Sequence, residues 1–386
     1  MDEKHRNRKE NRIHFFDNLR TAIIALVILF HAGAVYESSG ITASFWIVDD
    51  PTTNNISGIL NLIFDTFMMP SMFFVAGYFA SLSLSKNHGF AYLKNKFQRL
   101  MVPWLISITI LMPIYKFIFL ASRGLTQEHW TQYFHFSNGL ISQSWLWFLP
   151  ILFAFHLLFV VISKLNLRLP RLSFWGAIWA SFMIGVVYSF SLDIFNLDGW
   201  TKTIFLDFQN ERLLTYFLVF LIGAKSDRLK VFERKPANKK LYVFANATAW
   251  IPLNLYIYFL IYPLIRPGRF IFSGIIDKLF YWFSFYLSLL CMMYVMIETF
   301  RLYLNKSGKL WQELNRNSYY VYIIHVAILG GIAYLMLNAQ IPSLLKYLIL
   351  ALSTFVGSNL FLSISRQAAI SLQGKSRKTK VIHGEI

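Results

Sequence analysis

The sequence predicts an all-α fold: a polytopic membrane bundle of about ten transmembrane helices with both termini in the cytoplasm. First, 56% of the 386 residues are hydrophobic and only 15% are charged, whereas soluble domains carry about a quarter charged residues. Second, apolar stretches long enough to cross a hydrocarbon core, about 20 residues each, recur along the chain. Third, the basic residues gather in alternate segments between these stretches, which is typical of multi-pass membrane proteins.

The formal net charge of +18 could indicate a nucleic-acid partner, but basic residues between apolar spans more often follow the positive-inside rule. Of the 37 Lys and Arg residues, 28 lie in the segments predicted to be internal and six lie in those predicted to be external. We therefore expect contact with a lipid bilayer, an inner (cytoplasmic) membrane location, and no nucleic acid. A single cysteine provides neither a disulfide framework nor a cysteine-based metal site.

A hydropathy window of about 19 residues predicts spans at residues 14–36, 58–84, 100–121, 145–163, 173–192, 204–224, 241–264, 274–300, 317–337 and 344–365. We expect a cytoplasmic tail over residues 1–11, one transmembrane domain over 12–365 and a basic cytoplasmic tail over 366–386. The sixth span is the least apolar, because it opens with LDFQNE. Its outer part either lines a water-filled cavity or is a loop before a short helix.

Asp17, Arg20 and His31 interrupt the first span. At about 100° per residue, Arg20 and His31 return to nearly the same helix face, roughly 16 Å apart along the axis. Ionisable groups inside a span face protein or water, and they often mark functional sites. We expect Arg20 and His31 to line one cavity that opens toward the cytoplasm and is walled by the second, third and ninth spans. Alternatively, Asp17 and Arg20 cap the helix and His31 makes a structural interhelical hydrogen bond.

The second and third spans carry two further patterns. In MMPSMFFVAGYF, Gly77 permits close approach of a neighbouring backbone. Asp65, about two turns upstream of Met72 on the same span, could orient His31 or pair with another buried polar group. In KFQRLMVP, Lys96 and Arg99 lie at the predicted cytoplasmic interface, where they bind either a phosphate-bearing ligand or lipid headgroups.

The fourth and ninth spans contribute aromatic residues and a second histidine. Trp145 and Trp147, in SWLWFLPILF, form either an aromatic belt or a platform on which a sugar stacks. On the ninth span, Ser318, Tyr322 and His325 share one helix face. His325 is either a core residue bonded to tyrosine or a proton-handling partner of the first span. The outer-loop histidines His129 and His135 have no ligand spacing, so we assign no metal.

These motifs, in this order, resemble those of acyltransferase family 3 membrane proteins. The sequences DNLR…FHA and YFLVFLIGA are similar to the glucan biosynthesis protein C branch of that family. The similarity extends over roughly residues 12 to 330. One departure lies before the Phe pair: the chain reads Pro70, Ser71, Met72, where many members outside that branch have a carboxylate. The group that orients His31 is therefore left open.

The resemblance implies a membrane O-acyltransferase that moves an acetyl or succinyl group from cytoplasmic acyl-CoA, as a co-substrate, to a hydroxyl of a glycan or another envelope acceptor. In that scheme His31 is the base, because an imidazole titrates near neutral pH, and Arg20 orients the acyl group or CoA. Lys96 and Arg99 contact the CoA phosphates, and Trp145, Trp147, Tyr322 and His325 are the candidate substrate contacts. No permanently bound cofactor is implied.

A different class of function uses the same intramembrane residues. A transporter or flippase of a lipid-linked glycan could employ the His and Arg as a gate. The absence of inverted repeats in the sequence weighs against it.

Overall fold

The computed structural model describes residues 14–38, 45–134, 143–165, 172–203, 205–234 and 237–382. The chain divides into two compact units. The first unit comprises Met1–Ile23, Ile59–Pro113 and Glu128–Lys306, and the second comprises Ile24–Gly58, Ile114–Gln127 and Ser307–Ile386. Because the boundaries fall inside helices, the first three helices each contribute to both units.

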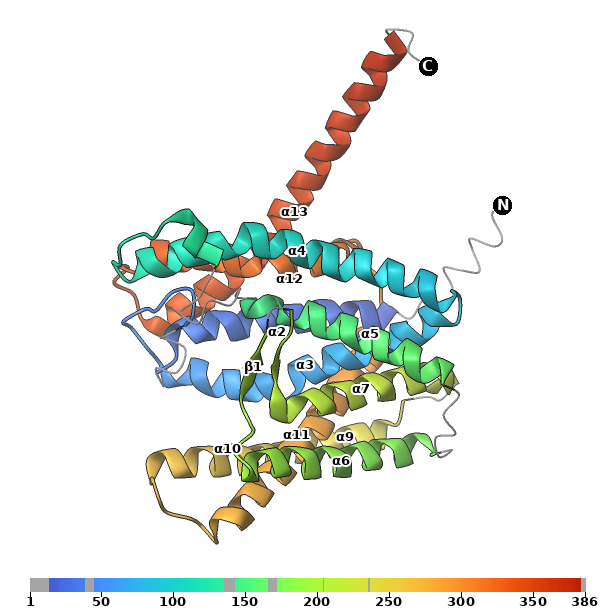
Figure 1. Ribbon diagram of the computed structural model, residues 1–386, viewed down its shortest axis with the longest axis vertical. Helices are drawn as coiled ribbons and strands as arrows, with labels where there is room; N and C mark the ends of the chain where they lie inside the picture. The colour runs from blue at the N-terminus through green and yellow to red at the C-terminus, as the bar shows by residue number, and fades with distance from the viewer. Residues whose placement is uncertain are drawn as a thin grey trace. The chain divides into compact units, whose positions relative to one another are not determined.

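Helices provide nearly all the regular structure of the described residues (Figure 1). Their bounds are α2 His14–Tyr36, α3 Asn55–Leu84, α4 Gly89–Ser122, η1 Trp130–Phe134, η2 Ser144–Trp147, α5 Phe148–Lys164, α6 Phe174–Ile194, α7 Asn210–Arg228, α8 Val231–Arg234, α9 Lys239–Thr248, α10 Trp250–Ile265, α11 Gly274–Tyr303, α12 Lys309–Met336 and α13 Ser343–Ile382.

Within these described ranges, nine helical stretches are long and apolar enough to cross a membrane. They coincide with nine of the ten predicted spans, so the prediction of an all-α polytopic bundle is confirmed. Helices α4 and α12 begin well before the predicted spans, because their first turns are polar and a hydropathy window does not register them.

The remaining predicted span, the sixth at residues 204–224, is wrong in its first part. An antiparallel hairpin of β1 Trp200–Lys202 and β2 Asp207–Gln209 precedes α7, which begins only at Asn210. Helix α7 is not among the nine apolar stretches, and its polar residues Glu211, Arg212 and Asp227 are buried. The helix therefore packs polar side chains against protein. If both termini are cytoplasmic, α7 must cross the membrane as a tenth helix. The cytoplasmic placement of the termini stays a prediction.

The hairpin is joined to α7 by polar contacts. The backbone amide of Gly199, a residue with φ of 101°, donates to Glu211 Oε2 at 2.8 Å. Within the hairpin itself, the amide of Thr203 donates to Asp207 Oδ1 at 3.3 Å. Burial nevertheless raises the pKa of the Asp207 carboxyl to about 6. Deprotonation of this carboxyl is thus opposed by its surroundings.

Helices α3 and α7 of the first unit cross at two glycines. A Cβ atom on Gly77 would overlap the carbonyl oxygen of Phe220, and one on Gly223 would overlap the carbonyl oxygen of Phe74. Phe73 fills the adjacent space, with its ring centroid 5.0 Å from that of Tyr216. The close-packing role expected for Gly77 is confirmed.

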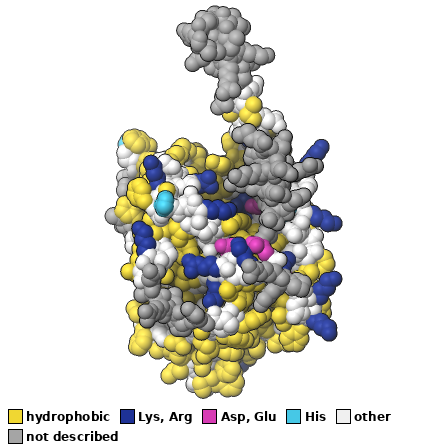
Figure 2. Space-filling model, turned by 90° about the vertical axis from the view of Figure 1, so that its right-hand side faces the viewer, with side chains coloured by type: hydrophobic (Ala, Val, Ile, Leu, Met, Phe, Trp, Pro, Cys, Tyr) yellow, Lys and Arg dark blue, Asp and Glu magenta, His cyan; other side chains and the backbone are white. Residues whose placement is uncertain are grey.

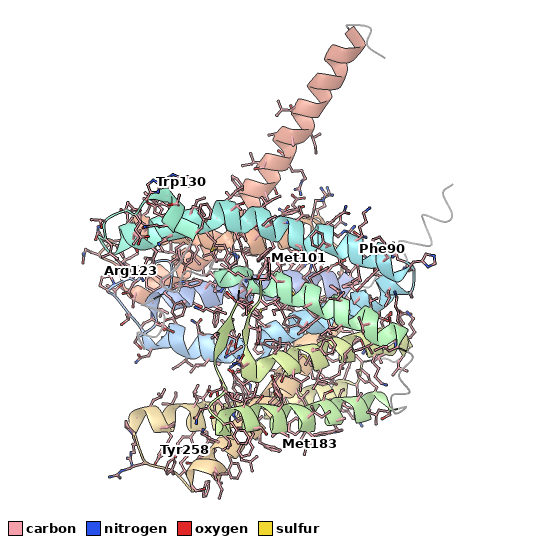
Figure 3. All side chains as sticks on the ribbon, in the orientation of Figure 1. Phe90, Met101, Arg123, Trp130, Met183 and Tyr258 are labelled. Carbon is pink, nitrogen blue, oxygen red and sulfur yellow. The ribbon has the colours of Figure 1, made fainter. Side chains whose placement is uncertain are left out.

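Four further helices of the first unit, α6, α7, α10 and α11, form contacts in the order α7, α6, α11 and α10 (Figure 1). Their outward side chains include Met183 on α6 and Tyr258 on α10, labelled in Figure 3, which are 56% and 52% exposed. Figure 2 shows a face on which hydrophobic side chains cover much of the surface. Such a surface suits contact with lipid.

The second unit is built on the contact between α12 and α13. Asn317 Nδ2 on α12 donates to Ser363 Oγ on α13 at 3.0 Å. Near the other end of α12, a Cβ on Gly330 would overlap the side chain of Ile47, which belongs to the segment after α2. This close approach brings that segment against α12.

The glycine crossing generates a prediction about stability. Gly77→Ala should lower the free energy of unfolding by about 1–3 kcal/mol, because the methyl group meets a backbone carbonyl that has little room to shift. Thermal denaturation of the purified protein in detergent measures the effect. Gly331→Ala is the matched control, since no described atom lies within 4 Å of its Cβ position. Equal melting temperatures for the two variants would contradict the crossing.

Candidate functional site

Two histidines from α2 and α12 form the centre of the second unit. His31 Nδ1 lies 2.8 Å from His325 Nε2. The rings are 10° from parallel, with centroids 5.1 Å apart. The distance between the centroids equals the nitrogen–nitrogen distance plus the distance from each nitrogen to its own ring centroid. The two nitrogens therefore lie on the line between the centroids, and the hydrogen bond lies in the common plane of the rings. This is favourable geometry for a hydrogen bond.

The backbone fixes the direction of this hydrogen bond. His325 Nδ1 lies 2.7 Å from the carbonyl oxygen of Tyr322 and 3.2 Å from that of Val321. A carbonyl only accepts, so Nδ1 of His325 carries the proton and Nε2 of the neutral ring is an acceptor. His31 Nδ1–H is therefore the donor. Nε2 of His31 is left with its lone pair, which is the form required of a base.

An indole covers one face of the His31 ring. The Trp46 ring centroid lies 4.8 Å from that of His31 at an interplanar angle of 32°. Trp46 Nε1 also donates to the His31 carbonyl oxygen at 3.1 Å. His31 is half-buried, whereas His325 and Trp46 are buried. The imidazole is thus held at its Nδ1 edge and on one face.

The face predicted for α12 is confirmed. Ser318, Tyr322 and His325 are 2%, 5% and 0% exposed. His325 satisfies both predicted possibilities in part, because it bonds to the backbone of Tyr322 and also to the histidine of the first span. The group that orients His31 is therefore His325.

Arg20 lies on the part of α2 that belongs to the first unit. Its Nη2 is 3.7 Å from Asp17 Oδ1, and its side chain is 34% exposed. The two residues thus form an ion pair one turn apart on α2. Arg20 and His31 occupy one unbroken helix, so the separation of roughly 16 Å along the axis holds. A single cavity reaching both residues stays a prediction.

Asp65 does not orient His31. Its Oδ2 lies 2.5 Å from Arg212 Nη1, and the guanidinium stands 4.8 Å from the Phe285 ring centroid. Of the two roles considered for Asp65, partner of another buried polar group is the one observed. The sequence offered both because it does not show which helix faces α3.

Lys96 and Arg99 lie one turn apart on α4. Lys96 Nζ is 5.4 Å from the Tyr92 ring centroid, and Arg99 is exposed. Tyr92 is anchored in turn, with its hydroxyl 2.6 Å from Nδ1 of the buried His156. The sequence analysis missed His156, although a histidine within the apolar stretch of the fourth span was a signal.

The two tryptophans at the start of the fourth span differ in exposure. Trp145 is 3% exposed, so its ring packs in the core and presents no platform to a sugar. Trp147 is half-buried, and its ring centroid lies 5.5 Å from that of Trp200. Of the two, only Trp147 is placed to meet a ligand. His135 lies outside the described residues, and in the part of the chain that is described no group of three His, Cys, Asp or Glu could hold a metal.

The fold and this geometry define a multi-pass membrane protein with a paired-histidine site inside its helices. A family model described as an acyltransferase domain, Acyl_transf_3, matches residues 13–362. The chain therefore belongs to acyltransferase family 3, and it is an acyltransferase that transfers groups other than amino-acyl groups. Neither the curated proteins nor the solved structures contain a match.

The direction of the histidine hydrogen bond can be measured. In bilayers at about pH 8, where a free imidazole is neutral, ¹⁵N solid-state NMR should show His325 protonated at Nδ1 and His31 protonated at Nδ1. Both rings would then be the less common Nδ1–H tautomer. His325→Phe should move His31 toward the ordinary mixture of tautomers, because its acceptor is removed. A His31 signal that is the same in both proteins would contradict the assignment.

Proposed function

We propose that the protein transfers an acetyl or succinyl group from cytoplasmic acyl-CoA to a hydroxyl of a glycan or another cell-envelope acceptor. The observation that carries the proposal is the hydrogen bond between His31 Nδ1 and His325 Nε2, from which we infer that His31 Nε2 keeps its lone pair for a proton. A sugar hydroxyl is a poor nucleophile, and a positioned base accelerates its attack. The family establishes acyl transfer, and the histidine pair supplies the base.

In the proposed reaction, His31 accepts one proton and later donates it. Nε2 accepts the acceptor's hydroxyl proton while the hydroxyl oxygen bonds to the thioester carbonyl carbon. When the carbon–sulfur bond breaks, the imidazolium returns the proton to the departing CoA sulfur. Throughout, His31 Nδ1 keeps its bond to His325 Nε2, which becomes stronger when the His31 ring is charged.

The proposed donor site lies on the first unit. Lys96 and the exposed Arg99 would bind the CoA phosphates at the cytoplasmic interface, because guanidinium and ammonium groups pair well with phosphate. Arg20, partly exposed on the α2 face shared with His31, would orient the CoA or acyl group. The pantetheine arm is long and thin enough to follow α2 from Arg20 to His31.

For the acceptor site we propose two aromatic side chains. Tyr322 lies about one turn before His325 on α12. The half-buried Trp147 offers an aromatic ring for a sugar. The sequence motifs of α2 and α7 that resemble the glucan branch favour a glucan acceptor and, slightly, a succinyl group.

We place the protein in the inner membrane with both termini in the cytoplasm, as the distribution of basic residues indicates.

Removal of the base tests this proposal. His31→Ala should lower acyl transfer at least about a hundredfold, the usual contribution of a positioned base, while the protein stays folded. Labelled acyl-CoA and a panel of glycans, incubated with purified protein, provide the measurement. His129→Ala is the control, because His129 is exposed outside the membrane spans. Full activity in well-folded His31→Ala would refute the mechanism.

The proposed phosphate contact predicts a different kinetic signature. Arg99→Ala should raise KM for acyl-CoA by about threefold to tenfold with little change in kcat, because a contact remote from the reacting carbonyl contributes uniform binding. The difference should shrink at high ionic strength. Lys94→Ala, at another exposed basic position of α4, should leave KM unchanged. A pure kcat defect in Arg99→Ala would place Arg99 elsewhere in the mechanism or the fold.

A further inference from the structure

The second unit contains an ion pair that is completely buried. Lys346 Nζ on α13 lies 2.9 Å from Asp50 Oδ2 and 3.2 Å from Asp50 Oδ1, and both side chains are 0% exposed. Lys346 also donates to the carbonyl oxygen of Leu337 at 3.2 Å. Desolvation of two charges is costly, so a buried pair is weak evidence for stability alone. Its directed bonds do specify where the Asp50 segment lies against α13.

Asp50 belongs to the segment that links α2 to α3, and its carboxylate organises the local backbone. Asp50 Oδ1 accepts from the amide and the hydroxyl of Thr52, at 2.9 and 2.6 Å. Two residues further, the amide of Asn54 donates to the carbonyl oxygen of Tyr36 at 2.8 Å. The segment is therefore folded back onto the end of α2, with Lys346 holding its centre.

The beginning of the segment's described part is held by the second-unit portion of α4 and the residue after it. Tyr115 Oη donates to the Phe45 carbonyl oxygen at 2.6 Å, and Arg123 Nη2 donates to the Trp46 carbonyl oxygen at 3.0 Å. Arg123, labelled in Figure 3, follows the last residue of α4. Trp46 is thus held at its own carbonyl oxygen by Arg123, and it lies between the attachments at Phe45 and Asp50.

We propose that the Asp50–Lys346 ion pair is a positioning element that holds Trp46 against the imidazole of His31. The pair lies four residues from Trp46 along the segment, and Ile47 between them is fully buried against Gly330. Trp46 shields one ring face of His31 and anchors its carbonyl. An indole face also attracts a cation, so Trp46 favours the imidazolium that forms during acyl transfer. This last effect, on turnover, rests on the proposed function.

The position of Trp46 can be tested without any substrate. Diethyl pyrocarbonate modifies accessible imidazoles, and peptide mass spectrometry gives the rate at His31 relative to the exposed His129 in the same sample. Lys346→Met should raise the relative rate at His31 by about tenfold or more, as expected for loss of a charged hydrogen-bonded contact. Trp46→Leu should raise it at least as much, because it removes the ring that covers His31. Rates at the wild-type value in these variants would overturn the proposal.

A double variant tests whether Lys346 acts through Trp46. If it does, Lys346→Met should have little further effect in the Trp46→Leu background, because the two changes share one route. Multiplicative effects would instead assign Lys346 an independent role and refute the proposal. Arg212→Met is the control for general loosening, since it breaks the ion pair between the buried Arg212 and the half-buried Asp65 in the first unit. An equal rise at His31 in this control would also overturn the proposal.

A second variant covers the case in which Lys346→Met fails to fold with an unpaired buried carboxylate. Asp50→Asn combined with Lys346→Met removes both charges and avoids that cost. The relative rate at His31 should rise here too, and an unchanged rate would contradict the role of the pair.

Kinetics then connect the positioning element to turnover. In Trp46→Leu we expect kcat to fall while KM for acyl-CoA stays constant, and Trp46→Phe should restore part of kcat by returning an aromatic face. If wild-type protein transfers no acyl group, the proposed function fails, and the modification rates still decide whether Asp50 and Lys346 hold Trp46.

Discussion

The hydrogen bond from His31 Nδ1 to His325 Nε2 is the interaction on which the site depends. Inside a membrane bundle a polar side chain needs a partner from protein or water. Here each histidine satisfies the other, and the Tyr322 carbonyl fixes the direction of the whole chain of bonds. The same bond that ties α2 to α12 therefore also determines which nitrogen of His31 can accept a proton.

Buried charge organises both units in a similar way. In the first unit Asp65 pairs with Arg212, joining α3 to α7. In the second unit Asp50 pairs with Lys346, joining the segment after α2 to α13. Each pair connects residues far apart in sequence, and breaking one leaves an uncompensated charge. Such pairs select one arrangement of helices, which apolar packing between similar surfaces does less sharply.

The sequence predicted those features that depend on local pattern. The first span matches α2 to the residue, and Gly77 packs as its motif indicated. The hairpin before α7 could not be predicted, because strands of three residues leave almost no periodicity. The partners of His31 and Asp65, and the burial of Trp145, depend on which helix faces carry each contact. Lys346 is one of the six basic residues counted as external from the sequence, although a lone cation among apolar residues was a signal of burial.

The central proposal is that this histidine pair serves acyl transfer from a donor at the cytoplasmic face to an acceptor at the opposite face of the membrane. The most direct measurement uses sealed vesicles containing the purified protein, with labelled acyl-CoA at its cytoplasmic face and an unlabelled glycan at the opposite face. The account predicts that label appears on the glycan, and that it does not with His31→Ala. Movement of unmodified glycan across the vesicle membrane without acylation would contradict the account and favour a transporter.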